Sequence, residues 1–434
     1  MRGVAALAAV AAVAAVAAVA GCEKKAAPVT TIEASAPPAD AAAVTLPDAA
    51  APGCRAVVEN GTALGGMQAR GAVTVALAKG HALLVSSRFT EAKGDVVETA
   101  SASRLELSAV TGAVESKPDL VAALHAKDEP ACCPLTWASA TAFGGELVTL
   151  SLGATRSGPK VCAGGAIAVQ GHGAAKALAT GQCHFSTAFA GAAHGEVAIA
   201  VMDGIVDPAK GSVPAVNAVV FAAGKSAPVR LESFPVPGTA TTERPKIDAL
   251  AAAASAGAAA AAYRVSRGAV QELHVVRLAL DGKPVGKVEV VDRGVVGAPT
   301  IAFDGETLHI VWSARAAEKE PYVLRATTWA AGAAPLPNQK LGTGVRSAYA
   351  PALAIAEGRF LLAWAEGDMT GVVKAGASPK GLAGALALAG AVSTPGVDAK
   401  SPVVALDHDA LFVAWQEVAA GREAELRASP LQCP

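Results

Sequence analysis

The sequence predicts an all-β protein built from repeats of about 50 residues. Three segments near the C-terminus, residues 299–312, 351–364 and 402–415, align without a gap, and each ends in tryptophan. Apolar residues alternate with other residues on both sides of a short polar turn in every segment, which is the pattern of two half-buried strands. Each segment therefore predicts a β-hairpin.

Each hairpin continues into a third and a fourth strand. A further apolar run follows each tryptophan and begins with a basic residue and an alanine, at Arg325, Lys374 and Arg427. Another apolar stretch completes the unit before the next proline. Four antiparallel strands in about 50 residues are typical of one blade of a β-propeller. A helical solenoid of similar period is disfavoured because the apolar residues recur at every second position.

Weaker copies of the unit lie upstream, at residues 75–87, 141–152, 188–201 and 245–263. The equivalent positions on the second strand are then Val85, Leu150, Val201, Tyr263, Trp312, Trp364 and Trp415. This alignment predicts seven four-stranded blades, with six or eight left open. The repeats resemble those of sialidase-like or seven-bladed propellers of exported bacterial proteins, but the Asp-box motif of sialidases is absent.

The N-terminus has the layout of an export signal. Arg2 precedes an Ala/Val run over residues 4–20, which ends at Gly21 and Cys22. The ending Val-Ala-Gly-Cys resembles the lipobox of bacterial lipoproteins. That resemblance implies cleavage between Gly21 and Cys22 and attachment of acyl chains, palmitate included, to Cys22. The alternative is an uncleaved membrane anchor, for which the Ala-rich run is short and weakly apolar.

Three segments follow from this organisation. Residues 1–21 form the signal peptide, residues 22–52 a lipidated Ala/Pro-rich tether, and residues 53–434 the propeller domain. Lipid chains would hold the protein on a membrane stably. Glu23 after the lipidated cysteine favours the outer membrane by analogy with Gram-negative sorting, without indicating its periplasmic or surface face.

The last blade lacks a fourth strand because only a short segment follows Trp415. Residues 55–59 are placed to supply that strand from the other end of the chain, which would remove an open sheet edge. Cys54 and Cys433 flank this closure and are predicted to form a disulfide; the alternative is that each pairs elsewhere. Cys132 and Cys133 are expected to pair with Cys162 and Cys183, in an order that the sequence leaves open.

Several motifs resemble metal or catalytic sites. The four clustered cysteines with His184 lack the spacing of a metal site, and Asp407, His408 and Asp409 occupy a predicted hairpin turn. We therefore expect no bound metal and no cofactor. Glu366 and Glu417, each two residues after a blade tryptophan, are the best candidates for paired catalytic carboxylates, although polar residues at a strand end have the same appearance.

Charge excludes another class of function. The chain has 36 Lys and Arg against 37 Asp and Glu, a formal net charge of −1, so it lacks the basic surface of a nucleic-acid-binding protein. The main prediction is a monomeric envelope lipoprotein whose propeller binds or scaffolds an envelope protein or glycan; whether it catalyses a reaction is left open, with no activity favoured. The alternative is an envelope glycan hydrolase or lyase. The predicted binding face comprises Arg315, Glu318, Lys319, Glu366, Asp368 and Glu417.

Overall fold

The structure is a computed structural model that describes residues 53–67, 72–92, 96–122, 124, 134–157, 160–161, 166–180, 188–206, 213–234, 245–317, 319–342, 346–368, 370–419 and 422–434. Contacts divide the chain into Met1–Asp48 and Ala49–Pro434, and every described residue belongs to the second unit. The predicted signal peptide, Cys22 and the tether therefore lie outside the described residues.

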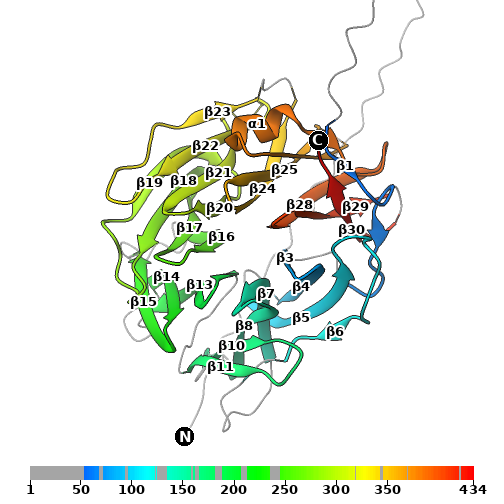
Figure 1. Ribbon diagram of the computed structural model, residues 1–434. Coiled ribbons are helices and arrows are strands. Elements are labelled where there is room, and N and C mark those ends of the chain that lie inside the picture. Colours follow the sequence, from blue (N-terminus) through cyan, green and yellow to red (C-terminus); the bar gives the residue numbers. More distant parts are fainter. Residues whose placement is uncertain are drawn as a thin grey trace, which may run out of the picture. The chain divides into compact units, whose positions relative to one another are not determined.

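The described residues fold almost entirely into strands, in consecutive sets that each run from an inner to an outer strand (Figure 1). The first set is β3 (Ala72–Ala78), β4 (His81–Ala92), β5 (Val96–Ser108) and β6 (Asp119–Leu120). The next is β7 (Pro134–Phe143), β8 (Glu146–Ser157), β10 (Ala166–Gln170) and β11 (Lys176–Thr180), with β9 (Lys160–Val161) beside β8. Then come β12 (Phe189–His194), β13 (Val197–Val206), β14 (Val213–Ala222) and β15 (Lys225–Ser233).

The second half of the chain repeats this order. One set is β16 (Lys246–Ala254), β17 (Ala259–Arg267), β18 (Val270–Leu278) and β19 (Glu289–Val296), and the next is β20 (Thr300–Asp304), β21 (Thr307–Arg315), β22 (Val323–Trp329) and β23 (Gln339–Leu341). It is followed by β24 (Ala348–Ala356), β25 (Arg359–Glu366), β26 (Val372–Ser378) and β27 (Gly390–Ala391), with helix α1 (Gly381–Ala387) before β27. Within the described ranges, no helix has the length and apolar character needed to cross a membrane.

The final set combines both ends of the chain. Strands β28 (Asp398–Asp407), β29 (Ala410–Val418) and β30 (Glu425–Gln432) are completed by β1 (Arg55–Ala56) and β2 (Thr62–Ala63), which both pair with β30. Sequence analysis predicts this fourth strand over residues 55–59, and the structure gives it fewer residues in the strand conformation. The disulfide between Cys54 and Cys433 lies beside β1.

The inner strands β3, β7, β12, β16, β20, β24 and β28 contact one another in that order, and β28 contacts β3. This closed cycle around a common centre is a β-propeller, as the sequence predicts (Figure 1). Hydrogen bonding alone gives five sheets among the described residues, because β5 bridges β7 and β19 bridges β21. Counting one blade for each inner strand gives seven, and that number stays an interpretation.

The three aligned segments of the sequence analysis form antiparallel hairpins. Ile301 pairs with Ile310 in β20–β21, Leu353 with Leu362 in β24–β25, and Val404 with Val413 in β28–β29. Successive side chains of a strand point to opposite faces of its sheet, so alternating apolar residues supply packing surface to a neighbouring blade. The alternating apolar residues in the sequence therefore identify the side chains that pack between blades.

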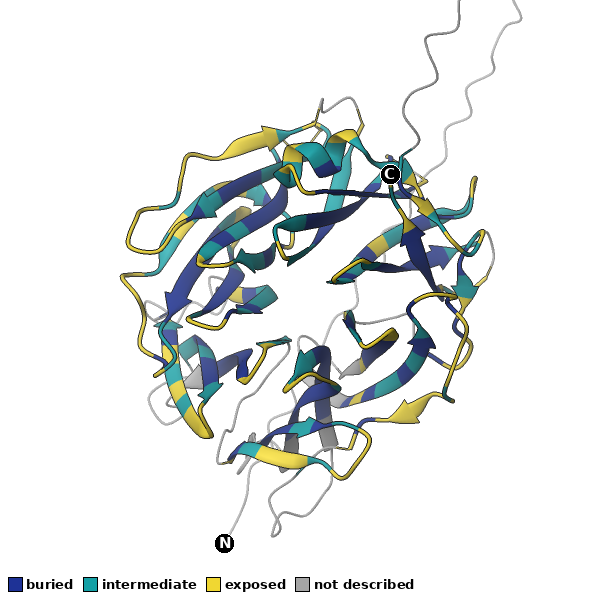
Figure 2. Cartoon of the chain, in the orientation of Figure 1, coloured by how far each residue is buried: buried dark blue, intermediate teal, exposed yellow. Residues whose placement is uncertain are grey.

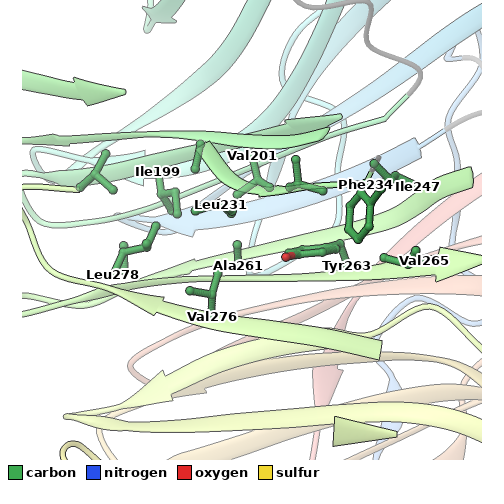
Figure 3. Close-up of a cluster of buried hydrophobic side chains, with 14 residues drawn as sticks. Ile199, Val201, Leu231, Phe234, Ile247, Ala261, Tyr263, Val265, Val276 and Leu278 are labelled. Carbon is green, nitrogen blue, oxygen red and sulfur yellow. The ribbon is translucent and has the colours of Figure 1, made fainter. Parts of the chain in front are cut away.

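Apolar packing between neighbouring sets holds the propeller together. The middle strands are buried, whereas exposed residues gather on outer strands and turns (Figure 2). Figure 3 shows Ile199 and Val201 of β13 facing Ala261 and Tyr263 of β17 in one such cluster. A comparable cluster packs Leu361 of β25 against buried side chains of β29. Apolar area removed from water in these layers is the main stabilising contribution.

Gly61 connects the N-terminal segment to the core. Its φ is +68°, and a Cβ atom there would lie 2.5 Å from Cη2 of Trp415. We expect Gly61→Ala to lower the free energy of unfolding by about 1–3 kcal/mol more than Gly80→Ala. Gly80 has a φ of +82° and open space where a Cβ atom would lie, so Gly80→Ala has the cost of a positive φ without the clash. Equal changes in denaturant unfolding for the two variants would contradict the contact with Trp415.

Candidate functional site

Buried aromatic side chains at the repeat position each donate a hydrogen bond to a carboxylate. The bonds are Tyr263 Oη to Glu232 at 2.8 Å, Trp312 Nε1 to Asp292 at 2.7 Å, Trp364 Nε1 to Glu366 at 3.3 Å and Trp415 Nε1 to Glu417 at 2.9 Å. A buried polar hydrogen without an acceptor is costly, so each aromatic ring requires such a partner. Glu366 and Glu417 therefore belong to the framework of their blades.

A basic residue directly across the sheet completes each group. Tyr263 pairs in register with His274, Trp312 with Arg325, Trp364 with Lys374 and Trp415 with Arg427. Each base also contacts the carboxylate that its aromatic partner contacts. The distances from the side-chain nitrogen of the base to the carboxylate oxygen are 2.8, 3.3, 2.8 and 2.8 Å respectively. We call each set an aromatic–carboxylate–base triad. The basic-Ala pairs of the sequence analysis mark three of these four bases.

The triad at Tyr263 extends into a larger polar cluster. His274, with 4% of its surface exposed, has Nδ1 at 2.8 Å from Glu232 Oε2 and Nε2 at 3.3 Å from Glu272 Oε2. Burial raises the pKa of Glu232, but hydrogen bonds from His274 and Tyr263 and the positive charges of His274 and Arg267 outweigh it, so the pKa is lowered. Burial, followed by the charge of Glu232, raises the pKa of Tyr263 and keeps its hydroxyl a donor.

Glu232 should make stability depend on pH. Because its pKa is lowered in the folded state, the stabilisation is present above its ordinary value of 4.5 and is lost as pH falls through the folded pKa. We expect Glu232→Gln to be less stable than the wild type near neutral pH, with a difference that shrinks in acid. Denaturant unfolding at a series of pH values checks this expectation. A difference that stays constant from about pH 7 to about pH 3 would contradict it.

The triad at Trp415 borders a cavity of about 340 Å³. The cavity lies where β29 ends and β30 begins, beside the loop that enters β28. Its lining comprises Asn60, Thr394, Val397, Glu417, Ala419, Arg422, Glu423, Glu425 and Arg427. Three glutamates and two arginines thus face one small volume, which is an unusual density of charge for a chain with 17% charged residues.

Glu417 and Arg427 form the rigid wall of this cavity. Glu417 is 4% exposed, and its Oε1 accepts hydrogen bonds from Trp415 Nε1 and from the Thr394 backbone N–H, each at 2.9 Å. Arg427 Nε lies 2.8 Å from Glu417 Oε2, and Arg427 Nη2 donates to Glu425 Oε2 at 2.8 Å. The polar contacts of Glu417 are therefore directed within the protein, which leaves other carboxylates for a ligand.

The remaining polar groups of the cavity are available to a ligand. Glu423 and Arg422 are exposed, and the Glu423 side chain has no hydrogen-bonded or ion-pair partner among the described residues. Thr394 Oγ1 is buried from solvent and also lacks a partner within the described ranges. A buried hydroxyl with unused donor and acceptor capacity is a ready contact for a bound polar molecule.

The other predicted face residues lie away from this cavity lining. Arg315 stacks over the ring of Tyr322 at 4.8 Å, Lys319 follows in the same loop, and Glu366 pairs with Lys374. Asp368 is exposed beyond the end of β25. Of the predicted face residues that the structure describes, Glu417 alone lines the cavity, and Glu318 lies outside the described residues.

The turn at Asp407–Asp409 is solvated, as the sequence interpretation favours. His408 has a side chain 74% exposed, with Nδ1 at 3.0 Å from Glu357 Oε1. That hydrogen bond is the largest cause of the raised pKa of His408. Cys132, Cys133, Cys162, Cys183 and His184 lie outside the described residues.

Sequence reasoning missed the cavity because its residues come from four separate segments. Asn60 and Arg427 are 367 positions apart, and only ring closure brings them together. Glu232 and Asp292 were missed for a similar reason, since each lies on the outer strand of the set preceding its aromatic partner. One local signal was present: Arg422, Glu423, Glu425 and Arg427 make the segment between β29 and the start of β30 densely charged.

No family model matches this chain. No curated protein matches it either. Among solved structures, it is similar to the GH43_1 enzyme from Xanthomonas citri complexed with xylose, at 11% identity and a TM-score of 0.33 over 56% of this chain and 85% of that one. It is also similar to the Penicillium chrysogenum alpha-L-arabinanase complexed with arabinobiose, at 10% identity and a TM-score of 0.35 over 54% of this chain and 77% of that one.

A third similar structure is the GH93 alpha-L-arabinofuranosidase of Fusarium graminearum with arabinobiose, at 12% identity and a TM-score of 0.40 over 66% of this chain and 89% of that one. These neighbours are glycoside hydrolases, so on this comparison the prediction of a binding or scaffolding module is wrong and its alternative, a glycan hydrolase, is favoured. Identities and TM-scores this low transfer no substrate and no residue role to this chain. The assignment of residue roles below therefore rests on the cavity itself.

Proposed function

We propose that this protein hydrolyses a glycan at the cavity between β29 and β30. The observation that carries the proposal is the lining of that cavity by Glu417, Glu423, Glu425, Arg422 and Arg427. Its volume of about 340 Å³ falls at the lower end of small-ligand sites, which run from roughly 300 to 1,000 Å³, and suits a short sugar segment.

Glycosidic hydrolysis requires two carboxyl groups, one that protonates the leaving oxygen and one that assists water or attacks the sugar. Glu423 and Glu425 are exposed, whereas Ala424 and Leu426 between and after them pack into a core cluster. This alternation places both glutamates on one side of an extended chain, with Cα atoms about 6–7 Å apart. They are the pair that we assign to the reaction.

The two carboxyl groups differ in their surroundings. Arg427 Nη2 contacts Glu425 and balances its charge, whereas Glu423 has no cationic partner among the described residues. We therefore assign the carboxylate role to Glu425 and the proton-donor role to Glu423. Arg422, Thr394 and Asn60 offer donors and acceptors of the kind that bind sugar hydroxyl groups.

The location of the enzyme is the second part of the proposal. Removal of residues 1–21, lipid on Cys22 and a tether over residues 22–52 would hold the propeller at the cell envelope, with the outer membrane favoured. The Cys54–Cys433 disulfide supports an oxidising compartment. An envelope glycan is then the substrate within reach, and the protein is proposed to act as a monomer without a metal or other cofactor.

Substitution of the two glutamates tests the reaction. We expect Glu423→Gln and Glu425→Gln each to lower kcat by about 100-fold or more, the usual contribution of a positioned acid or base. The measurement is release of reducing sugar from isolated cell-envelope and plant-wall polysaccharides, with aryl glycosides for kinetics. Glu357→Gln, in the exposed turn between β24 and β25, is the matched control and should retain full activity.

Two results would contradict this assignment. One is a wild-type protein that releases no reducing ends from any substrate in the panel, or that releases them only with the ultraviolet-absorbing unsaturated sugar of a lyase reaction. The other is retention of activity by both glutamate variants, which would exclude the cavity as the reaction site. Unchanged thermal unfolding of all three variants shows that the fold is intact in either case.

Substitution of Cys22 tests the anchor. We expect Cys22→Ser to abolish incorporation of labelled fatty acid and to release the protein from the membrane fraction, because serine cannot form the thioether. Fractionation and metabolic labelling of bacteria that express the chain measure both effects. Continued membrane association of the serine variant would instead favour an uncleaved anchor.

A further inference from the structure

The cavity depends on a segment from the opposite end of the chain. Asn60 lines it, and the carbonyl oxygens of Asn60 and Gly61 accept hydrogen bonds from Arg427 Nη1 at 2.9 and 3.3 Å. Arg427 in turn holds Glu417 and Glu425. The N-terminal segment therefore sets the position of the cation around which the charged cavity is organised.

Few backbone contacts hold this segment to the propeller. Strand β1 pairs with β30 only through Arg55 and Ala56, and β2 pairs with β30 only through Thr62 and Ala63. The backbone N–H groups of Val57 and Leu64 add bonds to β30, to the carbonyls of Pro430 and Leu426. Short edge segments of this kind open locally at a lower free energy than central strands.

The Cys54–Cys433 disulfide reinforces that weak joint covalently. It closes a sequence separation of 379 residues and lies directly beside β1. Cys54 is buried, and its backbone N–H donates to Leu388 O at 3.0 Å. Cys433 is partly exposed, which makes it the more accessible half of the bond for an external thiolate.

We propose that the Cys54–Cys433 disulfide is a redox switch for the cavity, with a protein dithiol as the reductant. The inference rests on the proposed function only in taking the same cavity as the site of reaction. Reduction would free the segment that begins at Cys54 from β30. Asn60 would then leave the cavity, and Arg427 would lose both carbonyl acceptors.

The reduction is a two-electron thiol–disulfide exchange. A thiolate of the dithiol attacks Sγ of Cys433, which breaks the bond to Cys54, forms a mixed disulfide and releases the Cys54 thiolate to take up a proton. The second thiol of the reductant loses its proton and attacks its own partner sulfur in the mixed disulfide. Cys433 leaves as a thiolate and is protonated, while the reductant becomes a disulfide.

Most of the core of the last blade lies on continuous strands. Trp415 packs in a cluster with Leu361, Val373 and Val413 of continuous strands, to which the N-terminal segment contributes the buried Cys54. Strands β28, β29 and β30 remain paired in sequence order. We therefore expect reduction to act first on the N-terminal segment and on the cavity that it completes.

Hydrogen exchange of the full-length protein tests the switch. The wild type is reduced with dithiothreitol, and the double variant Cys54→Ser/Cys433→Ser removes this one disulfide specifically. We expect exchange of the Val57 and Leu64 amides to rise by about 10-fold or more in both cases, and protection to return when the wild type is reoxidised. Amides of β17, far along the chain, should keep their exchange rates. Unchanged exchange at Val57 and Leu64, or a rise in both regions together, would overturn the proposal.

Activity measured in parallel separates this inference from the proposed function. Increased local exchange with a matching loss of glycan hydrolysis supports both. Increased exchange in a protein that is inactive in either redox state rejects the proposed hydrolysis and leaves the structural switch supported. Increased exchange with undiminished hydrolysis overturns the switch, because the cavity would then not need the segment.

Discussion

Closure of the ring between the first and last inner strands, β3 and β28, is the constraint on which the rest of the propeller depends. Each other neighbouring pair of inner strands is joined by continuous chain, whereas the contact between β28 and β3 closes a cycle that the backbone leaves open. An unpaired β30 would expose a row of N–H and C=O groups at a sheet edge. Residues from the N-terminal segment satisfy that edge, and the disulfide fixes them there.

A second constraint explains why charged residues occur in the blade interiors. A buried indole N–H or phenol O–H requires an acceptor, and a carboxylate that serves as acceptor requires a compensating cation. Tyr263, Trp312, Trp364 and Trp415 satisfy this requirement with one geometry, although their carboxylates come from different strands. At Trp415 alone the base of the triad also binds the closing segment, through Arg427. The cavity arises where these two constraints coincide.

This arrangement separates framework carboxylates from those available for chemistry. Glu366 and Glu417 look like catalytic candidates in the sequence because they follow tryptophans at a fixed spacing, but the spacing exists to satisfy the indole N–H. Glu423 and Glu425 have no counterpart in the other repeats and lie exposed at the cavity. Neither accepts a hydrogen bond from a blade tryptophan. Residues that break the repeat are therefore better functional candidates here than residues that follow it.

The sequence by itself determined the strands, the hairpins and the β-propeller class, because strand alternation is a local property of the chain. It also indicated the closing segment and the Cys54–Cys433 pair, since an incomplete last repeat requires a strand from elsewhere. The cavity, the acceptors Glu232 and Asp292, and the hold of Asn60 on Arg427 were decided only by the tertiary structure. Those contacts join residues on different strands and blades, and their spacing along the chain carries no information about their distance in space.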